Sequence, residues 1–119
     1  MNITTSIEKI EKPWGYELIW ANVKNKYVAK ILFINSNARL SLQYHNEKEE
    51  TLLVQEGILR VWNSENDLEY KDLGPGSIYH VKPGEVHRFG SARHLPVKLI
   101  EVSTTEIDDV VRLADDYNR

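Results

Sequence analysis

Hydrophobic and polar residues alternate in short stretches along most of this chain, and turn-forming residues separate the stretches. Residues 27–34 read Y-V-A-K-I-L-F-I, a β-branched and aromatic run that ends at the turn-forming Asn35-Ser36-Asn37. Similar short stretches occupy residues 40–45, 51–55, 58–62, 68–73, 77–81, 87–89 and 97–102. About eight strands with turns roughly every 8–12 residues predict a β-sandwich or a small barrel.

The C-terminal part of the chain has a different pattern. Thr105 is followed by acidic residues, as at the N-terminus of a helix, where carboxylates are favourable against the helix dipole. Hydrophobic residues then recur at helical spacing, at Ile107, Val110, Val111 and Ala114. This pattern predicts a short C-terminal helix that packs on the barrel wall.

The length and composition fit one globular domain over residues 1–119. A chain of 119 residues can bury a core without disulfides, and this one has no cysteine. Its net charge of −3 argues against a nucleic acid or an anionic membrane as partner, although a few cationic side chains suffice to bind a small anion. No apolar run resembles a signal peptide or a membrane span, so we expect a cytoplasmic protein.

Four potential metal ligands have a spacing that suits a single metal ion. They are Gln43, His45, Glu50 and His87, and the predicted strands place them on separate segments next to turns. Imidazole and carboxylate ligands suit Zn, Mn, Co, Fe or Ni, and an amide oxygen adds a weak, neutral ligand. A site without thiolates and with one weak ligand leaves positions for water or substrate, so the pattern favours a catalytic metal over a structural one.

The stretch from Arg39 to His45 alternates strictly between polar and apolar residues. In a regular strand, Arg39, Gln43 and His45 would therefore share one face. Such a polar face usually points to solvent, but in a small barrel it can instead line a pocket. We expect the second arrangement, with Arg39 beside the metal ligands.

The same residues resemble the two sequence motifs of the cupin family. The first motif, G-x5-H-x-H-x3,4-E-x6-G, aligns with Asn37, Gln43, His45, Glu50 and Gly57. The second, G-x5-P-x-G-x2-H-x3-N, aligns with Gly76, Lys82, Gly84, His87 and Ser91. The resemblance implies an all-β fold, the double-stranded β-helix or cupin jelly-roll barrel, with the short helix at its C-terminus.

Further segments resemble the C-terminal isomerase domain of the type II phosphomannose isomerase/mannose-1-phosphate guanylyltransferases. Gln43 replaces the first cupin histidine, as in the phosphomannose isomerases, and Lys12-Pro13-Trp14-Gly15 resembles their R-P-W-G segment. Residues 38–43, 99–102 and 108–119 resemble other segments of that domain. The family's run of histidines with a following arginine is here Asn46-Glu47-Lys48-Glu49.

This resemblance implies a metal-dependent aldose–ketose isomerase of sugar phosphates, with mannose 6-phosphate to fructose 6-phosphate as the specific expectation. The reaction needs a metal to polarise the carbonyl, a base that moves a proton between C2 and C1, and cations that hold the phosphate. Arg39 and then Lys30 are the expected cations, although either could instead face solvent. Glu101, a carboxylate in an otherwise apolar strand, is the expected base unless it too faces solvent.

Two other functions stay open on the sequence. One is a non-catalytic, metal-containing cupin that binds a sugar or a sugar phosphate. The other is a metal oxygenase, against which Gln43 in place of a histidine argues. Because small cupins commonly pair through strand edges, the fold also implies a homodimer.

Overall fold

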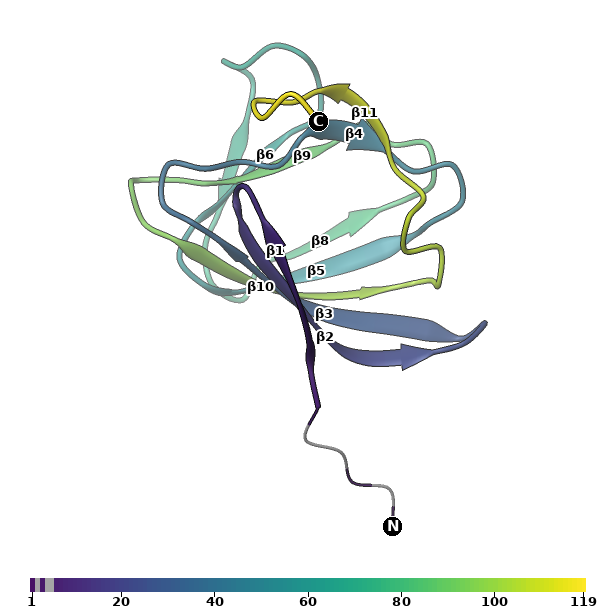
Figure 1. The fold of residues 1–119 in the computed structure, drawn as a ribbon. Helices are drawn as coiled ribbons and strands as arrows, with labels where there is room; N and C mark the ends of the chain where they lie inside the picture. Colours follow the sequence, from purple (N-terminus) through teal and green to yellow (C-terminus); the bar gives the residue numbers. More distant parts are fainter. Residues whose placement is uncertain (2, 4–5) are drawn as a thin grey trace.

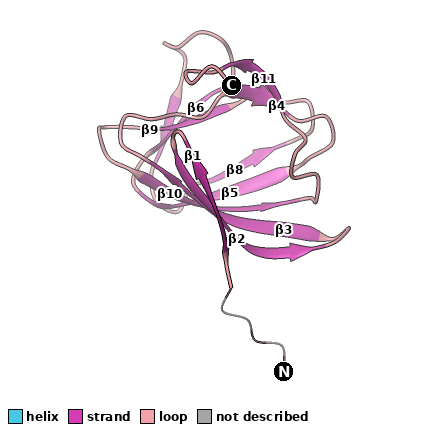
Figure 2. Cartoon of the chain, viewed as in Figure 1, coloured by secondary structure: helices cyan, strands magenta, loops and turns pink. Residues whose placement is uncertain are grey.

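The computed structural model describes residues 1, 3 and 6–119, and these residues form eleven β-strands and no helix (Figure 2). The strands are β1 (Glu8–Lys12), β2 (Gly15–Val23), β3 (Tyr27–Ile34), β4 (Leu42–Tyr44), β5 (Glu50–Glu56), β6 (Leu59–Trp62), β7 (Lys71–Leu73), β8 (Ile78–Val81), β9 (Arg88–Ser91), β10 (Val97–Ser103) and β11 (Val111–Ala114). The described part of the chain thus has no helix long and apolar enough to cross a membrane. The prediction of an all-β fold is confirmed.

The strands form two facing layers (Figure 1). The larger sheet has the strand order β1-β2-β3-β10-β5-β8, and every neighbouring pair is antiparallel. Opposite it lie the three-stranded sheet β7-β6-β9 and the two-stranded pair β11-β4. Two isolated β-bridges, Arg39–Gly90 and Gln43–His87, connect the β4 segment to the β9 segment. Figure 1 shows β4 and β11 across the top of the barrel, at its C-terminal end.

Alternation along the central strands places apolar and charged side chains at different levels of the barrel interior. In β10, Leu99 and Glu101 are buried, and their partners on β3 are Leu32 and Lys30, which are buried too. The leucine pair therefore lies at one level, and the Glu101–Lys30 pair lies at the next. This change of level divides the interior into an apolar half and a charged half.

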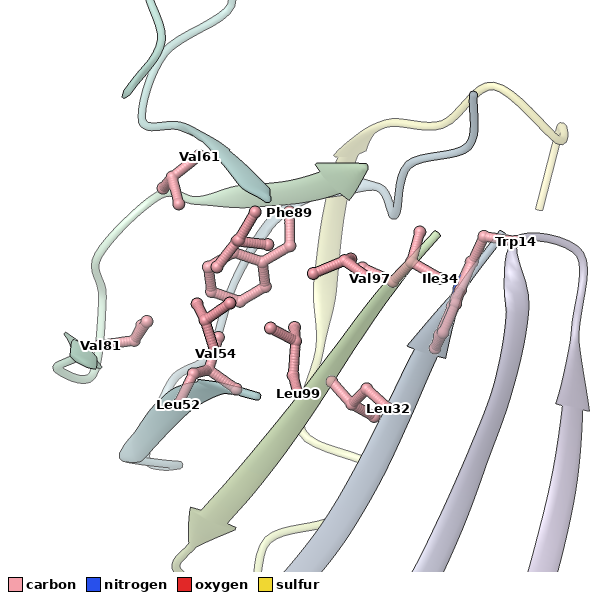
Figure 3. Packing of buried hydrophobic residues seen from close by; sticks show 11 residues of the cluster. Trp14, Leu32, Ile34, Leu52, Val54, Val61, Val81, Phe89, Val97 and Leu99 are labelled. Atoms are coloured by element: carbon pink, nitrogen blue, oxygen red, sulfur yellow. The ribbon is translucent and has the colours of Figure 1, made fainter. Parts of the chain in front are cut away.

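The apolar half contains one hydrophobic core cluster. Figure 3 shows Phe89 and Val61 of the smaller layer facing Val54 and Leu99 of the larger sheet, with Trp14 at the side. Each large side chain buried in this way contributes about 1.5–3 kcal/mol relative to an exposed one. Since this cluster stabilises the barrel, the charged half of the interior is free to hold functional groups.

The predicted C-terminal helix is wrong. Residues 105–110 form turns, with the amide of Asp109 bonded to the carbonyl of Glu106, and Val111–Ala114 then pairs with β4 as a strand. The helical spacing of the apolar residues was overridden because β4 offers a free edge, and β-branched Val110 and Val111 fit an extended backbone well. This pairing brings the C-terminal residues over the mouth of the barrel.

Gly57, the last residue of the first cupin motif, meets a backbone requirement at the turn between β5 and β6. Its φ is +82°, and a Cβ would lie 2.3 Å from the carbonyl oxygen of Pro96. Gly57→Ala should therefore lower the free energy of unfolding by roughly 2–4 kcal/mol in urea denaturation. Gly74→Ala is the matched control, because a Cβ there meets no atom within 4 Å and φ is not positive. Equal losses in the two variants would contradict this account.

Candidate metal centre

Three of the four predicted metal ligands come together in the charged half of the barrel. His45 follows β4, Glu50 begins β5 and His87 precedes β9, and all three side chains are buried. The Nε2 atoms of His45 and His87 lie 3.5 Å and 3.3 Å from Oε1 of Glu50. One ligand atom from each residue lies within 4.8 Å of the others, so the group could hold a metal ion.

Backbone carbonyls fix the tautomer of both imidazoles. Nδ1 of His45 lies against the carbonyl oxygen of Asp109, and Nδ1 of His87 lies 3.0 Å from that of Glu85. Because a carbonyl only accepts hydrogen bonds, each Nδ1 is the donor, and in the neutral form of either imidazole the lone pair lies on Nε2. Among the described residues, neither buried Nε2 has a hydrogen-bond partner. Two such nitrogens beside a carboxylate are the donor set of a divalent metal site.

Glu50 is ionised within this group. Burial alone would raise the pKa of Glu50, but the two imidazoles and the nearby ammonium of Lys48 hold its pKa well below the ordinary value. Nζ of Lys48 lies 3.1 Å from Oε2 of Glu50. Burial alone would likewise lower the pKa of Lys48, and the charges of Glu101 and Glu50 raise it instead. A buried carboxylate and a buried ammonium therefore lie at the base of the site.

Glu101 and Lys30 both point into the barrel. Burial first, and then the negative charge of Glu50, raise the pKa of Glu101 well above its ordinary value. Its Oε2 lies 3.6 Å from Nζ of Lys48, so the ammonium lies between the acidic side chains of Glu50 and Glu101. Nζ of Lys30 donates to Glu17 Oε2 at 3.0 Å. The side chains of Glu101 and Lys30 therefore face the barrel interior and not the solvent. Their predicted catalytic roles stay predictions.

The backbone of Gln43 pairs with that of His87, one of the three converging residues. Its amide and carbonyl exchange two hydrogen bonds of 2.9 Å with the backbone of His87. Its side-chain Oε1 accepts a hydrogen bond of 2.6 Å from the hydroxyl of Ser41, and the side chain lines the same cavity as His45. Its role as a fourth ligand stays a prediction.

A cavity of about 90 Å³ adjoins the metal group. Cationic side chains dominate its charged lining: Lys12, Lys30, Lys48, Arg112 and Arg119, against the single carboxylate Glu17. Arg112 lies opposite Gln43 in the β11–β4 pair and makes no salt bridge with the described residues. The excess of positive charge suits an anionic ligand. Ligand pockets usually exceed about 300 Å³, so a sugar phosphate would require side chains at the mouth to shift.

Arg39 lies outside this cavity, and the expectation that it shares a face with Gln43 is wrong. Two β-bridges, Arg39–Gly90 and Gln43–His87, connect the β4 segment to the β9 segment. Between the two bridges the chain advances four residues from Arg39 to Gln43 but only three from His87 to Gly90. One extra residue is a β-bulge, which reverses the side-chain alternation between Arg39 and Gln43. Strict alternation in the sequence could not reveal the inserted step.

The guanidinium of Arg39 instead fastens the C-terminal residues to the barrel. It donates to Asp116 at 2.6 Å and 3.1 Å and to Asp67 at 3.1 Å. The hydrogen bond to Asp116 opposes the effect of burial, and the pKa of Arg39 is raised above its ordinary value. The predicted role of Arg39 in phosphate binding is untested, and the residues that line the cavity are better placed for that role.

Sequence reasoning did not single out several residues of the site. Lys48 stands between two predicted ligands, so its position in the motif was an available signal. Arg112 and Arg119 lie in the tail that was predicted to be helical, and their place at the cavity depends on the β11–β4 pairing. Lys12 belongs to the segment that resembles R-P-W-G, where a cation was already visible.

A larger hollow of about 610 Å³ lies elsewhere, between the loop at residues 63–71 and Ile78. Its lining is mainly apolar and aromatic, including Leu68, Tyr70 and Tyr79, and contains none of the predicted ligands. Size alone would favour this hollow. The buried, convergent histidines and carboxylates favour the smaller cavity as the functional site.

Comparison with known proteins identifies one matching family and curated relatives of this chain. Residues 2–115 match the family described as Mannose-6-phosphate isomerase C-terminal. Mannose-1-phosphate guanylyltransferase of Escherichia coli (strain K12) is 33% identical over 115 residues, which make up 93% of this chain and 23% of that protein. The chain therefore spans about a quarter of the length of this relative.

Solved structures share the fold at low sequence identity. The polyketide cyclase RemF from Streptomyces resistomycificus superposes with a TM-score of 0.76 and 17% identity, over 95% of this chain and 85% of that chain. A sugar phosphate isomerase from the cupin superfamily, from Silicibacter pomeroyi, has a TM-score of 0.62 and 21% identity, over 75% of this chain and 58% of that chain. These matches show the cupin fold and nothing more specific.

Proposed function

This chain belongs to the Mannose-6-phosphate isomerase C-terminal family, and on that premise we propose that it is a metal-dependent aldose–ketose isomerase of sugar phosphates. Mannose 6-phosphate and fructose 6-phosphate are the proposed pair. The observation that carries the proposal is the position of a buried His–Glu–His group beside a cavity lined by cations. An isomerase of this kind needs both features, one for the carbonyl and one for the phosphate.

His45, Glu50 and His87 would hold one divalent metal ion, with Gln43 as a weak fourth ligand. Bound there, the metal would polarise the sugar carbonyl and its neighbouring hydroxyl. The carbonyls of Asp109 and Glu85 keep both imidazoles in the tautomer that such binding requires. The donor set suits Zn, Mn, Co, Fe or Ni and does not choose among them.

Proton transfer is assigned to Glu101 together with Lys48. The base must remove the proton from C2 of the aldose and return it to C1, while a hydroxyl proton moves from O2 to O1, so the reaction consumes no other reagent. Lys48 lines the cavity, and Glu101 lies directly behind it at 3.6 Å. Two carboxylates with an ammonium between them can hold a proton and release it without contact with bulk water.

Binding of the phosphate is assigned to Arg112, together with Lys12 and Arg119, which line the same cavity. Arg112 is opposite Gln43 and has no salt bridge with a described carboxylate, so its planar guanidinium is free to bind a phosphate with two hydrogen bonds. Lys30 is closer to the charged interior, where Glu17 holds it. Lys30 is therefore expected to add positive electrostatic potential to the cavity rather than to contact the phosphate directly.

The predicted homodimer stays a prediction, and the outer face of the large sheet is the surface that we propose for it. Cross-strand register aligns five apolar side chains across this face: Leu18, Ile31, Ile100, Leu53 and Ile78. Ile78 is 69% exposed, and Trp20 beside this row is 52% exposed. A continuous apolar face of this kind is typical of protein–protein contacts.

The direct test uses mannose 6-phosphate in deuterated water. Protein loaded in turn with Zn, Mn and Co is followed by NMR, with an EDTA-treated sample and His45→Ala as controls. We expect fructose 6-phosphate, or deuterium at the sugar carbon, only in the metal-loaded native protein. Removing either the metal or His45 should reduce the rate to background because the carbonyl is no longer polarised.

The same experiment distinguishes the other two functions. Broadened or shifted sugar signals without exchange would favour a non-catalytic cupin that binds a sugar phosphate. Consumption of oxygen by the metal-loaded protein would favour an oxygenase. Either result would contradict the proposed isomerase.

A further inference from the structure

The C-terminal strap (residues 105–119) crosses the mouth of the barrel and supplies one wall of the cavity. Its side chains Ile107, Val110, Arg112 and Arg119 line the cavity beside His45. Bidentate pairing of Asp116 with Arg39 fastens the strap at its far end. Asp109 also belongs to the strap. It contacts the loop of residues 45–48, which begins with the proposed metal ligand His45, and it does not line the cavity.

Asp109 makes four hydrogen bonds to this loop. Its Oδ1 accepts from the amide of Asn46 at 3.0 Å, and its Oδ2 accepts from the amides of Glu47 and Lys48 at 2.7 Å and 3.0 Å. Its backbone carbonyl accepts from Nδ1 of His45. These amide donors lower the pKa of Asp109 to about 2, so the side chain is a carboxylate throughout the working pH range. One residue thus holds the loop and orients the imidazole that precedes it.

We propose that Asp109 is a positioning residue that fixes the tautomer and direction of His45 and ties the metal ligand to the strap over the cavity. The proposal rests on the metal site proposed above. A carbonyl bonded to Nδ1 keeps the proton away from Nε2, and the carboxylate keeps that carbonyl in place by binding three successive amides. The wall that would contact the substrate and the ligand that would contact the metal are therefore joined by one residue, through its backbone carbonyl and its carboxylate.

The chemistry of this contact calls for a carboxylate. Three backbone N–H groups converge on two oxygens, and a carboxylate accepts all of them. Asparagine is nearly the same size, but its NH₂ group would face at least one N–H donor and lose that hydrogen bond. Asp108 provides a matched control, because it is exposed and its side chain has no hydrogen bond or salt bridge with the described residues.

The test compares native protein with Asp109→Asn, Asp109→Ala and Asp108→Asn. The tautomer of His45 is read from ¹⁵N NMR of metal-free protein at pH 8.5, where a free imidazole is neutral. We expect a fixed Nδ1–H tautomer in native protein and in Asp108→Asn, and a mixture of tautomers in both Asp109 variants. Titration with Co²⁺ should show binding about 10- to 100-fold weaker in Asp109→Asn, with native affinity in Asp108→Asn.

A native tautomer and native Co²⁺ affinity in Asp109→Asn and Asp109→Ala would overturn the proposal. The fold of each variant is checked by its amide NMR spectrum, and Asp109→Asn provides the decision if Asp109→Ala unfolds. Failure of the native protein to bind Co²⁺ would contradict the metal site of the proposed function. The tautomer in metal-free protein would still decide the role of Asp109, so the two failures are distinguishable.

Discussion

Glu50→Gln should abolish both metal binding and isomerase activity while the barrel remains folded. Glu50 contributes the anionic ligand, and its Oε1 lies between the Nε2 atoms of the two histidines. An amide keeps the shape of the side chain but removes the charge that attracts a divalent ion. We expect at least about 100-fold weaker metal binding, because loss of an outer-shell partner alone costs about 10- to 100-fold. Turnover of mannose 6-phosphate should fall to the level of EDTA-treated protein.

Thermal unfolding with and without metal measures the binding part of this prediction. A metal present at about 100 times its Kd stabilises the folded state by about 2.7 kcal/mol, which raises Tm by roughly 10 °C in a domain of this size. Native protein should show this shift, and Glu50→Gln should show less than about a fifth of it. Glu49→Gln is the matched control, since partly exposed Glu49 pairs with His80 outside the metal group. A native metal shift in Glu50→Gln would remove Glu50 from the ligand set.

The convergence of His45, Glu50 and His87 could be predicted from the sequence because their chemistry is concentrated in short, well-spaced motifs. His45 and Glu50 are separated by only four residues, and His87 lies on the segment that pairs with Gln43. Imidazoles and carboxylates beside turns are seldom needed for packing alone. The spacing in the sequence therefore predicted which residues converge, and the fold brings the segment with His45 and Glu50 next to the segment with His87.

Arg39 and the strap could not be placed in the same way. The side on which Arg39 lies depends on one inserted residue in the strand, and a β-bulge has no reliable signature in a single sequence. The strap has the apolar spacing of a helix, yet it forms a strand because β4 needs a partner at its edge. Tertiary pairing overrode local pattern in both places. As a result, Arg112 was overlooked as a cation of the site.

Lys48 illustrates a different limit. The sequence shows it between two predicted ligands, but an alternating pattern does not reveal that Lys48 is only 5% exposed. Burial of a lysine is costly unless carboxylates surround it, and here Glu50 and Glu101 do so. The side chains that make this burial possible come from β5 and β10, which are far apart in the sequence. Only the three-dimensional structure joins them.

Glu101→Gln should remove catalysis while metal binding is retained. Glu101 is buried behind Lys48 and is not among the three residues that converge as metal ligands. Glutamine keeps the side-chain volume but cannot take up or release a proton. Loss of a general acid–base group typically lowers turnover by about 10²- to 10⁴-fold, and we expect kcat to fall within this range. Co²⁺ titration should give native affinity.

Stability provides the control that separates this loss from unfolding. Burial and the charge of Glu50 raise the pKa of Glu101 above its ordinary value of 4.5, so the folded state keeps a proton that the unfolded chain releases. The free energy of unfolding therefore falls as pH rises from 4.5 towards the raised pKa. Glutamine does not ionise, so metal-free Glu101→Gln should be more stable than native protein, and the difference should grow with pH across that window.

Urea denaturation at several pH values in EDTA measures this difference, and Glu56→Gln, at an exposed position on β5, serves as the matched control. Buried acid groups at functional sites commonly reduce stability in return for activity, so a variant that is more stable and inactive fits a catalytic Glu101. Native turnover in Glu101→Gln would exclude Glu101 from proton transfer. Lys48, the neighbour that lines the cavity, would then be the next residue to replace.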